Sequence, residues 1–263
     1  METLKIVKIL KGNPKFERRL TVQTAEGRVF CAKNRKCPKR QETMNSVWLA
    51  NEVVYYGFAR SAGLWVPDAA ILLWDDEALF GSEKHNGRVE LKNEDALLRI
   101  VERHPENRIQ LTKALLLDLA LLNCDREASA ILVDKEDYLW FIDHDKSLWG
   151  DGMEEHNFTP KPGDLGRIDV SKLPKASDNF IGDYLQFQTA NAIVWDQDVA
   201  TITGAFQSLP LNQEMFHSSC SAIPQEWLPQ TLVPRMEEFL KVWWDELKQL
   251  FDCADFQKQI SLT

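Results

Sequence analysis

The segment from Leu122 to Trp149, LNCDREASAILVDKEDYLWFIDHDKSLW, constrains the fold of this chain more than any other stretch. It contains two apolar runs, Ala130–Val133 and Tyr138–Ile142. The polar residues Asp134–Asp137 lie between them. Two short apolar runs joined by a polar turn are typical of a β-hairpin, and we predict one here.

The residues on either side of this hairpin extend the pattern. The strongly apolar run Leu111–Leu122 precedes it and is long enough for a helix. One aspartate stands at each mouth of the hairpin, Asp125 before it and Asp143 after it. We therefore expect two acidic side chains to be presented together, one from a loop and one from a strand end.

Composition indicates an ordinary globular protein. The chain has 263 residues, of which 44% are hydrophobic and 27% charged. No apolar run approaches the roughly 20 residues of a membrane span, and the first residues lack a signal-peptide pattern. The five cysteines are scattered and form no C-x-x-C pair, so we expect no structural zinc site and a reducing, cytoplasmic location.

The charge is spread unevenly along the chain. Residues 1–42 contain twelve Lys and Arg but only four Asp and Glu, a formal charge of +8, although the whole chain carries −9. A basic N-terminal part suits an anionic ligand such as a nucleotide phosphate, or an acidic protein partner. No nucleic-acid-binding motif accompanies the charge, so we do not expect nucleic-acid binding.

The N-terminal part reads as β-structure followed by a helix. Residues 3–10, 19–23 and 28–33 alternate as strands, and the first turn contains Gly12. Lys33 ends the third strand. Glu52 lies nineteen residues on, inside a helical pattern over Glu42–Ala62. Two more strands lead to Gly81.

From Asp178 onward the pattern is helical. This part contains Trp227, Trp243 and Trp244, which we expect in the core.

Several of these motifs resemble one family. The residues NCDR, a hairpin and then ID are similar to the N-x-D-R-x-x-x-N and I-D signature of HipA-like kinases. Type II phosphatidylinositol 4-kinases carry a similar signature. The segment LANEVVYYGFARSAGLWVP and the residues LFGSE also resemble HipA-like sequences. The resemblance covers roughly residues 5–250.

The resemblance implies an α+β, bilobal protein-kinase-like fold. The β-rich N-lobe would comprise residues 1–82, and the mostly helical C-lobe residues 83–263. ATP and Mg²⁺ would bind between the lobes. In such folds a strand lysine, paired with a helix glutamate, contacts the α- and β-phosphates, and an aspartate beyond a hairpin binds the metal ion.

The resemblance also implies a role for individual residues. The catalytic pair would be Asp125, which would accept or orient the substrate hydroxyl, and Arg126, which would hold the loop or the developing charge. Nucleotide binding is implied for six residues: Lys33, Glu52, Gly12, Gly81, Ser82 and Glu83. Asp143 would bind Mg²⁺, and Asp145 could also reach a metal ion. His144, between them, is expected to be packed or solvent-facing rather than catalytic.

One position departs from the family pattern. Ala130 stands where the signature has its last, metal-binding asparagine, and a methyl group cannot bind a metal ion. Three accounts stay open. The chain is a pseudokinase that binds nucleotide without turnover, or it is active with one metal ion or with Asp145 or Glu127 as the substitute ligand, or Ala130 is an engineered inactivating change.

The function implied is transfer of the γ-phosphate of ATP to a Ser or Thr hydroxyl of a protein. A phosphatidylinositol-type lipid kinase is one alternative, and a non-catalytic module that binds nucleotide or a partner protein is the other. The HipA-like resemblance also suggests that an acidic or antitoxin-like protein is a partner that binds the basic N-lobe.

Overall fold

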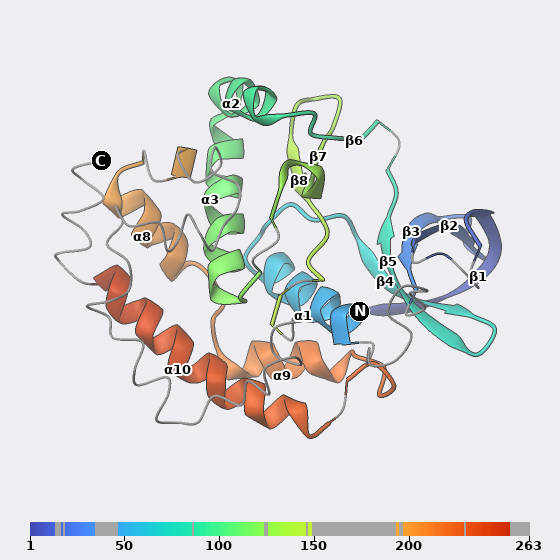
Figure 1. Cartoon of the computed structure of the whole chain (residues 1–263). Helices are drawn as coiled ribbons and strands as arrows, with labels where there is room; N and C mark the ends of the chain where they lie inside the picture. The colour runs from blue at the N-terminus through green and yellow to red at the C-terminus, as the bar shows by residue number, and fades with distance from the viewer. Residues whose placement is uncertain are drawn as a thin grey trace.

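The computed structural model describes residues 1–13, 17, 19–34, 47–85, 87–123, 126–145, 147–148, 193–194, 197–228 and 230–252. It contains both α-helices and β-strands, as predicted (Figure 1). A β-barrel lies at one side of the molecule, and helices α8, α9 and α10 lie at the other. In the described part of the chain, no helix is long and apolar enough to cross a membrane.

Five strands close the barrel, in the spatial order β1-β2-β3-β5-β4. Their bounds are β1 Glu2–Lys11, β2 Arg19–Thr24, β3 Val29–Lys33, β4 Ala69–Trp74 and β5 Glu77–Glu83. Strands β1 and β4 pair in parallel, and the other neighbours are antiparallel.

Strand β2 shows why these residues form a barrel. Its buried residues are Leu20, Val22 and Thr24, which alternate with the more exposed Arg19, Thr21 and Gln23. Because side chains of a strand alternate between faces, the apolar set fills the barrel and the polar set faces outward. The barrel core consists of Ile6, Leu20, Val22, Phe30, Ala32, Ala70, Leu72 and Leu79.

The predicted hairpin is present. Strands β7 (Ile131–Val133) and β8 (Leu139–Phe141) pair antiparallel, and β6 (Val89–Glu90) adds a third strand beside β7. The turn between β7 and β8 is held by Asp134, whose Oδ1 accepts from the backbone N–H groups of Glu136 and Tyr138. The side chain of an aspartate thus closes the turn, as is common in such positions.

The helices form the larger core. Their bounds are α1 Val47–Ser61, α2 Glu94–Arg103, α3 Pro105–Ala120, α8 Val199–Gln207, α9 Gln213–Ser221 and α10 Leu232–Asp252, and η1 (Ala128–Ala130) is a short 3₁₀ turn. Asn93 caps α2 by accepting from the N–H of Ala96, and α3 begins at Pro105, a favoured first helical residue. Helices α1 and α3 are buried along most of their length.

The tryptophans of α10 fix the end of α3. Trp243 and Trp244 donate their indole N–H groups to the backbone oxygens of Leu119 (3.1 Å) and Ala120 (3.0 Å). The last carbonyls of a helix have no partner within the helix, so these bonds satisfy them. The prediction that Trp227, Trp243 and Trp244 belong to the core is confirmed, because all three are buried. Helix α10 therefore holds the end of α3, from which the next loop begins.

Candidate active site

The end of β3 and the middle of α1 meet at one ion pair. Lys33, the last residue of β3, donates from Nζ to Oε1 of Glu52, and its side chain is 12% exposed. Glu52 is only 2% exposed and also accepts from the backbone N–H of His144 at 3.1 Å. The structure thus brings together the strand lysine and helix glutamate that the sequence pairs, and Lys33 is not a solvated surface residue.

Two more carboxylates surround the same ammonium group. Nζ of Lys33 contacts Oδ1 of Asp143 and lies 3.2 Å from Oδ2 of Asp145. Asp143 lies two residues after the end of β8 and has a φ of +62°, in the left-handed region that non-glycine residues seldom adopt. Backbone strain of this kind is often found at functional sites.

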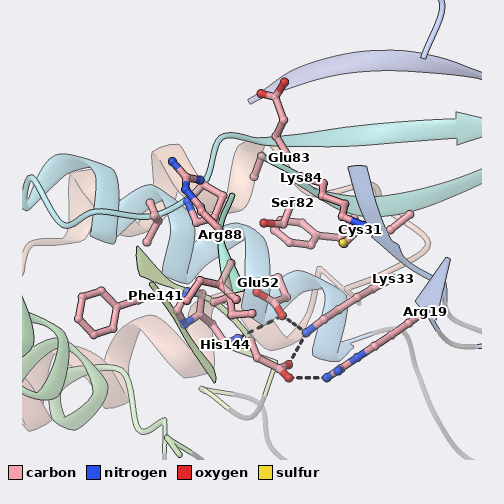
Figure 2. A pocket seen from close by; sticks show the side chains of 18 of the residues that line it. Arg19, Cys31, Lys33, Glu52, Ser82, Glu83, Lys84, Arg88, Phe141 and His144 are labelled. Carbon is pink, nitrogen blue, oxygen red and sulfur yellow. Dashed lines mark hydrogen bonds and ion pairs between the residues drawn. The ribbon is translucent and has the colours of Figure 1, made fainter. Parts of the chain in front are cut away.

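A second cation completes the cluster. Nη2 of Arg19, at the start of β2, contacts Oδ2 of Asp143. Lys33 and Arg19 extend in the same direction toward the carboxylates (Figure 2). With all groups ionised, three carboxylates face two cations, so the cluster carries a net charge of −1.

The pKa values of these groups follow from burial and from this crowding. Burial opposes the charged form of Lys33, but Glu52, Asp145 and Asp143 together raise its pKa above the usual range. Burial would raise the pKa of Asp143, yet Lys33 and then Arg19 hold it well below the usual range. Burial, together with the neighbouring aspartates, raises the pKa of Glu52. The lysine is therefore protonated and Asp143 ionised at neutral pH.

Arg126, predicted in a catalytic role, is fully buried. Its Nε and Nη2 each donate to Asp118 of α3 at 2.8 Å, and the carboxylate of Asp118 is also fully buried. Its Nη1 donates to the backbone oxygens of Ile142 (2.7 Å) and Ala130 (3.3 Å). Arg126 thus links both mouths of the hairpin to α3, and its role in catalysis stays a prediction.

An aromatic stack connects this network to α1. The rings of Tyr55 and His144 lie 3.8 Å apart at an interplanar angle of 8°. The Tyr55 hydroxyl donates to Asp118 at 2.7 Å, and Nδ1 of His144 lies 2.9 Å from Nη2 of Arg126. Burial, followed by the charges of Arg126 and Lys33, lowers the pKa of His144 well below its usual value. His144 is therefore packed, which is one of the two environments that the sequence left open, and its low pKa keeps it neutral at pH 7.

A cavity of about 780 Å³ opens beside the charged cluster. Lys33, Arg19 and Asp143 line one part of it, and Ser82, Glu83, Lys84 and Arg88 line another part at and after the end of β5. Figure 2 shows the labelled members of both groups around the same pocket. Leu132 and Phe141 of the hairpin contribute to the lining as well. The cavity therefore joins the barrel, the segment after β5 and the hairpin, three parts that the sequence separates widely.

Of the three neighbouring residues for which nucleotide binding is implied, Ser82 and Glu83 line this cavity and Gly81 does not. Oε2 of Glu83 accepts from Nη2 of Arg28 at 2.7 Å, and this pairing lowers the pKa of Glu83. Gly81 faces the barrel core instead: a Cβ there would lie 2.3 Å from Cδ1 of Leu72. The glycine therefore makes room for barrel packing.

Gly12 does not line the cavity, although Lys11 and Glu17 on either side of its turn do. Its φ is +95°, a conformation that glycine adopts without steric cost. The predicted turn is therefore present at the edge of the cavity.

The remaining predicted positions lie around the loop after α3. Asp125 lies outside the described residues. Ala130 is buried and is not part of the cavity lining, whereas Glu127 and Ser129 are. The Ser129 hydroxyl donates to Oε1 of Glu127 at 2.6 Å. Among the described residues of this segment, Glu127 is therefore the acidic side chain that lines the cavity.

The acidic cluster has the donors that Mg²⁺ prefers. One carboxylate oxygen from each of Glu52, Asp143 and Asp145 lies within 4.8 Å of the other two. Mg²⁺ takes oxygen ligands, usually one or two carboxylates with water and phosphates. Asp143 is the most exposed of the three, at 26%, and Glu52 already holds Lys33. The residues present fit a magnesium ion on Asp143 with Asp145 beside it.

Comparisons with known proteins bear on the fold. No family model matches the chain, and no curated protein matches it. Among solved structures it is similar to the crystal structure of a Helicobacter pylori proinflammatory kinase, CtkA, with a TM-score of 0.61. The alignment covers 100% of this chain and 98% of that chain at 14% sequence identity. The chain has a kinase-like fold.

Two important residues of this kinase-like fold were not predicted from the sequence. Asp118 is the buried partner of Arg126, and a single charge inside the apolar run LLLDLALL was the available signal. Arg19 reaches Asp143 across 124 positions, and no sequence spacing indicates that contact.

Proposed function

We propose that this protein is an ATP-dependent kinase with an N-lobe over residues 1–82 and a C-lobe over residues 83–263. It transfers the γ-phosphate of ATP to a hydroxyl group, that of Ser or Thr in a protein substrate. One observation carries the proposal: Lys33, held by Glu52, contacts Asp143 in the lining of a cavity of about 780 Å³. Phosphoryl transfer needs positioning and charge neutralisation, and this arrangement supplies both.

The proposal assigns a task to each part of the cavity. Lys33 binds the α- and β-phosphates while Glu52 keeps its ammonium group in place. The segment of Ser82 and Glu83 receives the adenine, because it lines the same cavity as Lys33 and Asp143. Asp143 and Asp145 hold Mg²⁺, which when bound neutralises phosphate charge. Asp125 accepts or orients the substrate hydroxyl.

A non-catalytic nucleotide-binding module is the second candidate, and Ala130 is the observation that favours it. Its methyl group supplies no metal ligand, and its backbone oxygen already accepts from Arg126 and from the N–H of Ile142. Glu127 lines the cavity and is the replacement ligand that an active enzyme would use. The two candidates share nucleotide binding and differ in turnover.

Nucleotide binding is tested first, by calorimetric titration with ATP and MgCl₂. Lys33→Met is expected to weaken ATP binding by about 10- to 150-fold, since hydrogen bonds to charged groups contribute about 1.5–3 kcal/mol. Lys8→Met is the control, because Lys8 is an exposed strand lysine outside the cavity lining. Wild-type protein that does not bind millimolar ATP would refute both candidates.

Turnover is tested next. Mass spectrometry of the protein after incubation with ATP and Mg²⁺, alone and with acidic or Ser-rich protein substrates, detects phosphate transfer. Phosphorylated product that disappears in Asp125→Asn supports the enzyme. ATP binding without any phosphorylated product or ADP supports the non-catalytic module.

A further inference from the structure

Two cations stand directly opposite each other in the barrel. Arg19 of β2 and Lys33 of β3 are register partners in the antiparallel pair. Partners in such a pair point to the same face of the sheet, with Cβ atoms about 4.5–5.5 Å apart. Like charges in this position destabilise a sheet unless an anion lies between them. The pair therefore forms an anion-binding fork on the face of the barrel that lines the cavity.

In the described structure the anion between them is Asp143. Lys33 contacts its Oδ1 and Arg19 contacts its Oδ2. Each oxygen of this carboxylate thus has a cationic partner. A metal ion that binds Asp143 competes with both cations for this carboxylate.

The two cations are held very differently. Lys33 is 12% exposed and also contacts Glu52 and Asp145. Arg19 is 66% exposed, and among the described residues Asp143 is the partner of its guanidinium group. Exposed ion pairs of this kind are weak. Arg19 is therefore the cation that a metal ion displaces from Asp143.

We propose that Arg19 is a second phosphate-binding residue, which releases Asp143 when the magnesium–nucleotide complex enters and then contacts its phosphates beside Lys33. This inference rests on the proposed function. A guanidinium group suits the task, because its planar donors can bind a phosphate through two hydrogen bonds. Every charge stays paired in this exchange, because Asp143 then binds the metal ion while Arg19 and Lys33 contact the phosphates.

The exchange predicts opposite effects on two ligands. Arg19→Met is expected to bind Mn²⁺ alone about two- to fivefold more tightly, because Asp143 loses a competing cation. The same variant is expected to bind inorganic tripolyphosphate with Mg²⁺ about tenfold more weakly, because one phosphate contact is lost. Adenosine, which has no phosphate, should bind equally to both proteins. Mn²⁺ is followed by electron paramagnetic resonance, and the other two probes by calorimetry.

The chain offers a closely matched control. Arg103 is 65% exposed and pairs with Asp137 at 3.1 Å, away from the cavity. Arg103→Met should leave the binding of all three probes unchanged. Arg19→Lys should recover part of the tripolyphosphate affinity, and melting temperatures of all variants confirm that they are folded.

Each outcome decides between the proposals. If wild-type protein binds Mg–ATP but Arg19→Met binds tripolyphosphate as tightly as wild type, the proposed phosphate-binding role of Arg19 is wrong and the kinase proposal stands. If Arg19→Met weakens Mn²⁺ binding together with tripolyphosphate binding, Arg19 supports the site structurally and the exchange is wrong. If wild-type protein binds neither Mg–ATP nor tripolyphosphate, the proposed function fails and the fork fails with it.

Discussion

Replacing Asp118 with asparagine tests the buried network most directly. Asp118 lies in the last turn of α3 and is fully buried, as is its partner Arg126. Its carboxylate accepts two hydrogen bonds from Arg126, and others from Tyr55 and from the side-chain amide of Asn123. Asparagine has the same shape but no charge. The Asp118→Asn variant therefore leaves the guanidinium charge buried without a counter-charge.

The expected loss is large. Removing one partner of a buried ion pair costs about 3–5 kcal/mol, because the remaining charge is desolvated and unpaired. A domain is stable by only about 5–15 kcal/mol, so Asp118→Asn should remove about a fifth or more of the free energy of unfolding. Tyr55→Phe removes one hydrogen bond to the same carboxylate and should cost only about 1 kcal/mol.

Urea denaturation of the variants gives the free energy of unfolding. Asp137→Asn is the control, because it breaks an exposed pair with Arg103 and should cost less than about 0.5 kcal/mol. Combining Asp118→Leu with Arg126→Met should recover much of the loss, since apolar replacements of a buried pair are often tolerated. A loss below about 1 kcal/mol in Asp118→Asn would contradict this account, because it would mean that water reaches Arg126.

Three further predictions concern other parts of the site. The pKa of buried His144 is low, so below the usual pKa of about 6.5 the unfolded chain binds a proton that the folded protein excludes. The free energy of unfolding should therefore fall by up to about 1.4 kcal/mol for each pH unit below that value. In urea titrations between pH 5 and 7, His144→Phe should remove this slope. Gly81→Ala places a methyl group against Leu72 and should cost about 1–3 kcal/mol of unfolding free energy, and an unchanged melting temperature would contradict the packing account. Ala130→Asn supplies the missing ligand and should raise ATP hydrolysis or autophosphorylation by about 10²–10³-fold, with Asp125→Asn abolishing the gain; an unchanged rate despite ATP binding would favour the non-catalytic module.

Local patterns predicted much of the fold. The hairpin, the strands that flank the turn at Asp75 and Asp76, and the long apolar helix before Asn123 all appear in the structure. Their periodicity reflects contacts between near neighbours in the chain, which a sequence displays directly. The predicted extent of the lobes and the roles of the individual site residues stay predictions.

The contacts that shape the site are long-range, and the sequence conceals them. Arg19 and Asp143 meet only because β2 and β3 pair in one particular register. Asp118 and Arg126 meet only because the chain turns sharply after α3. Gly81 illustrates the same difficulty. The family resemblance implies nucleotide binding at this glycine, but in the structure its missing side chain makes room for Leu72. The sequence alone does not distinguish a glycine needed for ligand binding from one needed for packing.

The closure of the barrel has a consequence for how this protein meets other chains. Each of its five strands pairs with two neighbours, so the barrel has no edge strand. Strand β1 closes it by pairing with β4 over Glu2–Lys5 and with β2 over Ile6–Lys11. Loss of β1 would uncover β2 and β4 at once, because β1 is the strand between them. A truncated chain that begins after Lys11 should therefore aggregate through the two strands that the intact barrel conceals.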